Sequence, residues 1–190
     1  MNFNPKKYSL LVLLLIGSFV FQSCKKSEEV KAPEGNNSKD FVWKEKISAA
    51  DIPDAPIRGF IKGKELKIDY INFEKWRGSG DNVLNFGNKK PTQSCGYVEN
   101  DDAVQLMKKS GDLPKGEIVK TSFDVNMDGF VANYHFTEKE NMKNVSVPWN
   151  CALFIDEITD DVVKGRIAIC FKDDTKSWIA GKFEAARCYN

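Results

Sequence analysis

The sequence predicts an all-β domain, an antiparallel β-sandwich or a related barrel-like arrangement with one short helix, preceded by an N-terminal extension. Three observations lead to this prediction. The 190 residues are 42% hydrophobic and 29% charged, which is the composition of one ordinary globular domain. From about Phe41 onward, short apolar or alternating runs are separated by Gly, Pro and Asp clusters, as in sandwiches and barrels. The last of these runs form a clear hairpin.

The expected strands follow one another from residue 57 to residue 188, with turn-forming residues between them. They cover Ile57–Ile61, Leu66–Phe73, Val83–Phe86, Gly96–Glu99, Glu117–Val125, Phe130–Thr137, Val145–Glu157, Val163–Lys172 and Ser177–Cys188. One helix is expected over Asp101–Ser110. Asn100 or Asp101 can cap its start, apolar residues follow, and Gly111 can end it.

The C-terminal hairpin shows the alternation of a strand most clearly. One side chain in two is apolar in each of its strands, and the turn between them is Asp173–Lys176. We expect these alternating side chains to face the core: Ile167, Ile169 and Phe171 in one strand, and Ile179, Gly181, Phe183 and Ala185 in the other.

The first 23 residues have the layout of an export signal. Residues 1–7 carry positive charge, Leu10–Phe21 is almost entirely apolar, and Ser23 and Cys24 follow. A transmembrane helix needs about 20 apolar residues, so this run is too short to span a membrane comfortably. An ordinary secretory signal with a chance cysteine at this place is the alternative interpretation.

The sequence FQSC at positions 21–24 resembles the relaxed lipobox of bacterial membrane lipoproteins, which signal peptidase II cuts before the lipid-bearing cysteine. It departs from the usual pattern at Phe21, where Leu is usual, and at Gln22, where a small residue is usual. The resemblance implies a signal peptide that ends at residue 23, with diacylglycerol and an N-acyl chain such as palmitate on Cys24. Because Lys25 rather than Asp follows, it also implies an outer-membrane or cell-surface destination.

Residues 24–40 are expected to form a flexible linker, because they contain no aromatic residue and few apolar ones. The folded domain is expected over residues 41–190. Its tail, VKGRIAICFKDDTKSWIAGKFEAARC at positions 163–188, resembles the C-terminal hairpin of small β-sandwich domains in uncharacterised bacterial lipoproteins. That resemblance implies a fold class and no activity.

The charge pattern argues against nucleic-acid binding. Without residues 1–23 the chain has nearly equal numbers of acidic and basic side chains, and they are interspersed. With no polybasic stripe, membrane attachment is expected to come from the lipid on Cys24 alone.

If Cys24 carries lipid, four of the five cysteines remain, which is an even number. The remaining four, Cys95, Cys151, Cys170 and Cys188, are expected to form two structural disulfides, as exported proteins usually do. Three pairings are open, and buried free thiols are the alternative. No CxxC spacing is present, so a zinc or haem site is not expected.

One short motif has the spacing of a calcium loop. Asp124, Asn126 and Asp128 precede Gly129 at the sixth position, but His135 replaces the bidentate Glu at the twelfth. Asp128-Gly129 between alternating runs is also typical of a type I′ hairpin turn. We favour the turn and keep calcium as the alternative.

No catalytic residue and no cofactor are predicted. His135 is the only histidine, so a catalytic triad would have to use it, and no nucleophile-elbow motif accompanies it. Acidic clusters lie where turns are expected. Among the four tryptophans, Trp76 and Trp149 lie near expected loops and are the candidates for an exposed sugar-stacking platform.

These observations predict a lipid-anchored, non-enzymatic protein of the cell envelope that binds another macromolecule through its surface. Two alternatives remain. The domain could be a carbohydrate-binding or calcium-dependent surface module, or an extracellular hydrolase that uses paired carboxylates or His135.

Overall fold

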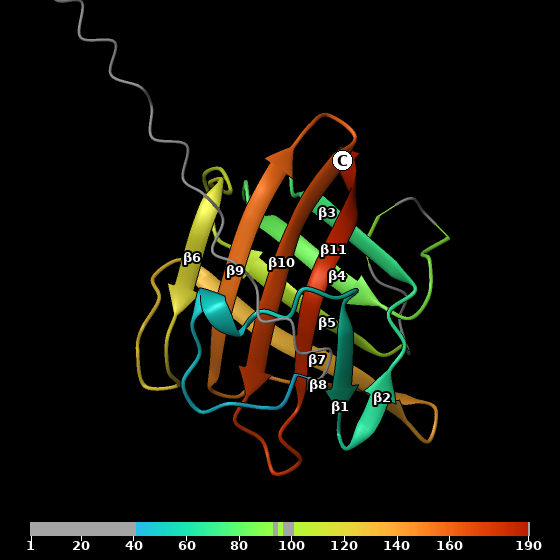
Figure 1. Ribbon diagram of the computed structural model, residues 1–190. Helices are drawn as coiled ribbons and strands as arrows, with labels where there is room; N and C mark the ends of the chain where they lie inside the picture. The colour runs from blue at the N-terminus through green and yellow to red at the C-terminus, as the bar shows by residue number, and fades with distance from the viewer. Residues whose placement is uncertain (1–40, 93–94, 97–100, 190) are drawn as a thin grey trace, which may run out of the picture.

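The computed structural model describes residues 41–189 except 93–94 and 97–100 (Figure 1). The predicted signal segment, Cys24 and the linker lie outside the described residues, as does most of the strand expected at Gly96–Glu99. The described chain is nearly all β and contains no α-helix, which confirms the all-β prediction. Its elements are η1 (Ala49–Asp51), β1 (Arg58–Ile61), β2 (Lys64–Leu66), β3 (Tyr70–Lys75), β4 (Asn82–Gly87), β5 (Ala103–Lys108), β6 (Gly116–Lys120), β7 (Phe130–Glu138), β8 (Asn141–Val145), β9 (Trp149–Ile158), β10 (Val162–Phe171) and β11 (Trp178–Tyr189). Within the described ranges, no helix is long and apolar enough to cross a membrane.

The strands form one curled sheet in the order β6-β9-β10-β11-β3-β4-β5-β7-β8, and the β1–β2 hairpin joins it at β11. Figure 1 shows β9, β10 and β11 crossing in front of β4, β5 and β7, so the sheet curls into a half-barrel. The expectation of a purely antiparallel sheet is wrong, because β11 and β3 run parallel. The reason is the β1–β2 hairpin. Because β1 runs antiparallel to β11 and β2 runs antiparallel to β1, the chain leaves β2 in the direction of β11 and enters β3 in that same direction.

One edge of β11 serves two partners in turn. Residues 178–180 pair with β1, whereas residues 186–189 pair with β3. Between them, Gly181 has a φ of +136°, and a Cβ there would lie 2.5 Å from the Cα of Ile57. Glycine lets the chain before β1 cross at this point, where the Lys182 N–H donates to the Ala55 carbonyl at 2.7 Å.

The main core fills the concave side of the sheet. The predicted core-facing residues of the C-terminal hairpin are confirmed there, since Ile167, Ile169 and Phe171 are fully buried. Aromatic contacts join the two halves of the curled sheet: Phe86 meets Phe183 edge-on at 5.4 Å, and Tyr134 meets Phe171 at 5.0 Å. Such pairs add about 0.5–1.5 kcal/mol each to the effect of burial.

A second, smaller core lies on the outer side of β9, β10 and β11. The segment that precedes β1 crosses these strands (Figure 1) and buries Ile52 completely against them. The strands present small side chains there, Ala152, Ala168 and Ala180, so that the covering backbone can approach closely. Burial of one such isoleucine stabilises the fold by roughly 1.5–3 kcal/mol.

The predicted helix over Asp101–Ser110 is wrong, because this segment contains β5. The strand lies between β4 and β7, and its side chains are buried on both faces of the sheet. Val104 and Leu106 enter the main core, whereas Gln105 points to the other face and donates to Asn85 Oδ1 at 2.9 Å. Two-sided burial removes the simple alternation that marks a strand in the sequence.

The Asp128-Gly129 turn exists, but it is not a hairpin turn. The Phe130 N–H donates to the Met127 carbonyl at 3.2 Å, and Gly129 has a φ of +76°. Asp128 does not have a positive φ, so the type I′ geometry is absent. The turn leads from β6 into β7, and these strands pair with β9 and with β5 and β8 rather than with each other.

Candidate functional site

The four predicted disulfide cysteines separate into one bridge and two thiols. Cys95 and Cys188 are bonded, with 5.8 Å between their Cα atoms, and this bond ties the loop before β5 to the end of β11. Cys151 and Cys170 are buried free thiols, so the second expected disulfide is absent. In the β9–β10 register, Cys151 lies opposite Ile169 and Cys170 lies opposite Asn150. The two thiols therefore occupy opposite faces of the sheet.

Burial raises the pKa of both free thiols, to about 12 for Cys170. A thiolate is the reactive form of cysteine, so burial disfavours the reactive form of both groups. Their spacing in the sequence gave no sign of this, because the faces on which they lie depend on strand register.

The residues of the calcium motif lie on an exposed loop between β6 and β7. Asn126 donates its side-chain amide to Asp128 Oδ1 at 2.9 Å, and Asp124 is exposed. Within the described residues, no group of three or more His, Cys, Asp or Glu side chains is placed to hold a metal ion. Calcium binding stays a prediction from the sequence.

His135 is buried in β7, with 2% of its surface exposed. Burial lowers its pKa, and the carboxyl groups of Asp102 and Asp101 partly oppose this effect. In the register of the sheet it lies opposite Ala103 of β5 and Asn144 of β8.

The two tryptophans named as candidates for a sugar-stacking platform do not form one. Trp149 is 9% exposed at the start of β9, where Lys120 Nζ lies 5.1 Å from its ring centroid. Trp76, in the turn after β3, is 37% exposed. Because Trp149 is buried, the pair cannot offer two accessible ring faces to one ligand.

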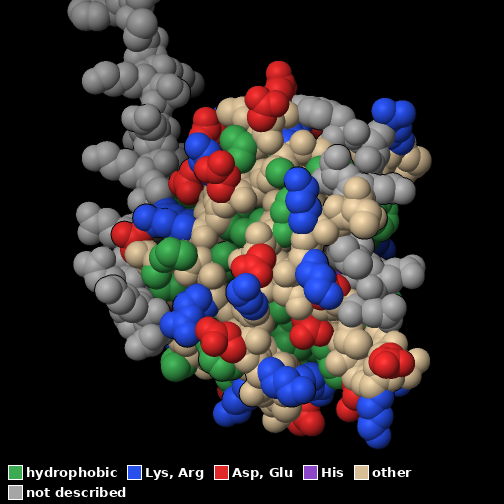
Figure 2. All heavy atoms as spheres, turned by 90° about the vertical axis from the view of Figure 1, so that its right-hand side faces the viewer, with side chains coloured by type: hydrophobic (Ala, Val, Ile, Leu, Met, Phe, Trp, Pro, Cys, Tyr) green, Lys and Arg blue, Asp and Glu red, His purple; other side chains and the backbone are tan. Residues whose placement is uncertain are grey.

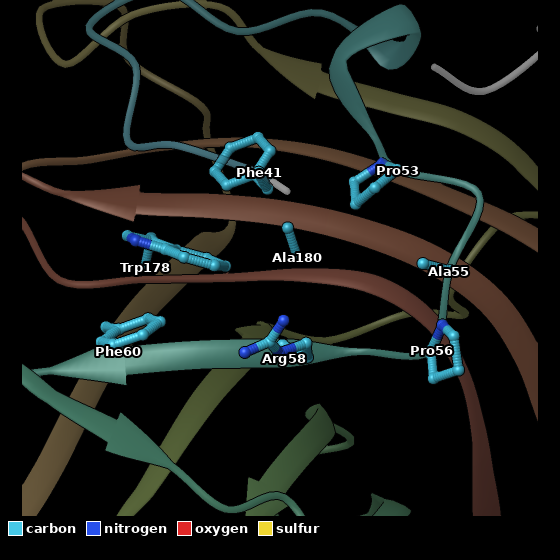
Figure 3. Close-up of a pocket in the computed structure, with 8 residues that line it drawn as sticks. All are labelled: Phe41, Pro53, Ala55, Pro56, Arg58, Phe60, Trp178 and Ala180. Carbon is cyan, nitrogen blue, oxygen red and sulfur yellow. The ribbon is translucent and has the colours of Figure 1, made fainter. Parts of the chain in front are cut away.

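A different tryptophan lines a hollow on the outer side of β1 and β11, shown in Figure 3. The hollow has a volume of about 160 Å³, and its walls are aromatic, proline and alanine side chains with one arginine. The residues that line it are Phe41, Pro53, Ala55, Pro56, Arg58, Phe60, Trp178 and Ala180.

The aromatic wall is a row of three rings. Trp178 lies between Phe60, 5.3 Å away between ring centroids, and Phe41, 5.1 Å away. Phe60 and Trp178 are cross-strand partners in the β1–β11 register, so the sheet itself fixes their spacing. Phe41 begins the segment that covers the outer side of the sheet. The sequence offered no signal for this row, because its members are 19 and 118 residues apart.

The opposite wall comes from the chain that crosses β11. Figure 3 places Pro53, Ala55 and Pro56 across the hollow from the rings, with the small side chain of Ala180 between them. Two prolines restrict this segment, and the Ile57 N–H and Lys182 carbonyl hold its end at 3.0 Å. Backbone hydrogen bonds therefore fix both walls of the hollow.

Two ion pairs lie beside the hollow. Arg58 Nη2 donates to Glu65 Oε1 at 3.0 Å, and Glu65 lies across from Phe60 in the β1–β2 register. On the other side, Lys182 pairs with Asp54, which stands between two lining residues. All four side chains are about half exposed. Donors and acceptors are thus present on both sides, with no net charge.

A larger hollow of about 610 Å³ lies at the open side of the half-barrel, between the β1–β2 hairpin and β7. Its walls include long charged side chains, among them Lys62, Lys64 and Lys139, and two of these residues belong to turns with positive φ. Binding sites are usually preformed and partly apolar. The smaller hollow meets that description better, and we take it as the candidate site.

In comparisons with known proteins, no family model, curated protein or solved structure matches the chain.

Proposed function

We propose that this protein is exported and anchored to the cell envelope by lipid on Cys24, and that its β domain binds another macromolecule without catalysis. The Cys95–Cys188 disulfide supports the export, because such bonds persist in oxidising compartments and are rare in the bacterial cytoplasm. The N-terminal sequence supports the anchor, since a charged segment, an apolar run and a cysteine follow in the order of a lipoprotein signal.

The aromatic hollow is the observation that supports binding. It has a preformed apolar wall, a restricted opposite wall and polar groups at its rim, which are the features of a ligand site. Figure 2, which views the side formed by β1, β2 and β3, shows acidic and basic side chains interspersed. A mixed surface of this kind favours a specific contact at the hollow over adhesion through charge.

The two-layer interpretation of the fold is part of this proposal. The contacts between Phe86 and Phe183, and between Tyr134 and Phe171, support a sandwich-like arrangement in which halves of one sheet face each other. In that arrangement, the hollow lies on the outside of one layer.

Intact mass and peptide mapping of the native protein, taken from its membrane fraction without reductant, test the anchor. We expect a triacylated peptide that begins at Cys24 and a disulfide-linked peptide pair containing Cys95 and Cys188. An unmodified mature N-terminus would overturn the proposal of a lipid anchor.

A further inference from the structure

From the aromatic hollow and its rim we infer that this site binds one ring of a neutral saccharide. The inference rests on the proposed binding function and names the class of its partner. Four features of the hollow support it: the aromatic wall, the paired donors and acceptors, the absence of net charge, and the size.

The aromatic wall suits a sugar ring. The C–H groups on one face of a pyranose form an apolar surface, and aromatic faces pack against such surfaces. Trp178 has the largest ring in the hollow and lies between Phe41 and Phe60, with 5.1 and 5.3 Å between ring centroids (Figure 3). A sugar would therefore contact the row of three rings as a whole, and the row loses little freedom on binding because its rings already hold one another.

The rim matches the hydroxyl groups at the edge of the ring. A hydroxyl donates one hydrogen bond and accepts others. Arg58 can donate a hydrogen bond to one sugar hydroxyl, and the adjacent Glu65 can accept one from the next hydroxyl along the ring. Lys182 and Asp54 repeat the arrangement on the other side of the hollow. Each pair is about half exposed and so remains reachable.

The balance of charge distinguishes between ligand classes. A phosphate, a carboxylate or an anionic lipid headgroup would approach Arg58 or Lys182 but would also meet the carboxylates of Glu65 and Asp54. Like charges at close range disfavour binding. A neutral ligand with hydroxyls avoids this repulsion and uses all four groups.

The volume of about 160 Å³ sets the length of the bound unit. Pockets for drug-sized ligands enclose roughly 300–1,000 Å³, so this hollow accommodates about one ring. The remainder of a longer glycan would extend over the surface.

The experiment uses the mature chain with Cys24→Ser, which stays soluble because it carries no lipid. Its probes are linear hexasaccharides of glucose, xylose, mannose and N-acetylglucosamine, titrated by calorimetry and by tryptophan fluorescence. Binding of at least one of them is expected. Trp178→Ala should weaken that binding by about tenfold, and Arg58→Ala by about two- to tenfold.

Lys75→Ala is the matched control, because Lys75 is about half exposed and also forms an ion pair, with Asp112 at 2.8 Å. It is the last residue of β3 and lies opposite Tyr189, at the far end of β11 from the hollow. The substitution should leave binding unchanged. Melting temperatures verify that each variant is folded, and Arg58→Ala keeps the test valid if Trp178→Ala unfolds.

Three results would overturn the inference: no binding of any neutral hexasaccharide, binding that Arg58→Ala and folded Trp178→Ala leave unchanged, or tighter binding of oligogalacturonate or of phosphatidylethanolamine–phosphatidylglycerol vesicles. If instead Arg58→Ala abolished capture of a protein partner while no sugar bound, the saccharide would be wrong and the proposed binding function would stand. The mass of the lipidated peptide tests the anchor separately.

Discussion

Replacing Asn85 with alanine is expected to destabilise the domain strongly, because this side chain joins a buried polar network on the outer face of β3, β4 and β5. Its amide donates to Asn72 Oδ1 at 2.9 Å and to Glu74 Oε1 at 2.7 Å. Its carbonyl accepts from Gln105 Nε2 at 2.9 Å. All four side chains are at most 7% exposed.

The network also reaches the disulfide-linked loop, because Asn72 Nδ2 donates to the carbonyl of Gly96 at 2.7 Å. The alanine variant loses three hydrogen bonds, each with a net contribution of about 0.5–1.5 kcal/mol, and a buried polar group left unsatisfied costs about 1–3 kcal/mol. Together these effects predict a loss of about 3 to 5 kcal/mol. For a domain of this size the melting temperature should fall by about 10 °C.

Urea unfolding followed by tryptophan fluorescence, with thermal melts in parallel, measures this effect. Asn144→Ala is the matched control, because Asn144 is an exposed asparagine on β8 and should change the free energy of unfolding by less than about 0.5 kcal/mol. A loss below about 1 kcal/mol for Asn85→Ala would refute the network as a source of stability.

Further predictions concern the thiols, a close contact and the acid response. Without reductant, the mature Cys24→Ser chain should show no reactive thiol while folded and two in denaturant, from Cys151 and Cys170; rapid modification of the folded chain by a thiol reagent would contradict their burial. Gly165→Ala should lower the urea midpoint markedly, since a Cβ would lie 2.4 Å from the Phe154 carbonyl oxygen. An unchanged midpoint would show that β9, whose pairing with β10 shifts by one residue at this point, adjusts freely. Burial alone raises the pKa of Asp173, but hydrogen bonds from Ser177 and Tyr134 outweigh it and hold the pKa below its usual range. The stabilisation by the ionised carboxyl is therefore present above about pH 4 and is lost as the pH falls through the folded-state pKa. In Asp173→Asn, the free energy of unfolding should therefore fall less steeply below pH 4. An unchanged fall would exclude Asp173 as a source of the acid sensitivity.

The C-terminal hairpin was predictable because its information is local. Ile167, Ile169 and Phe171 alternate with residues of the other face, and the turn residues between the strands are clear. The alternation of apolar and polar side chains did not reveal β5. Gln105 is buried on the outer face, where it bonds to Asn85, 20 residues away, and nothing in its own segment indicates that burial.

The sequence by itself determined that the chain is β-rich and where its clearest hairpin lies. It also predicts an export signal and a lipid-bearing cysteine before the domain. Only the tertiary structure decided which cysteines pair, how the sheet curls and where a ligand fits. Cys151 and Cys170 lie on opposite faces because of strand register, and Phe41 and Trp178 meet only because the segment before β1 folds back over β11. Contacts of this kind depend on the order and direction of distant strands, which no local pattern encodes.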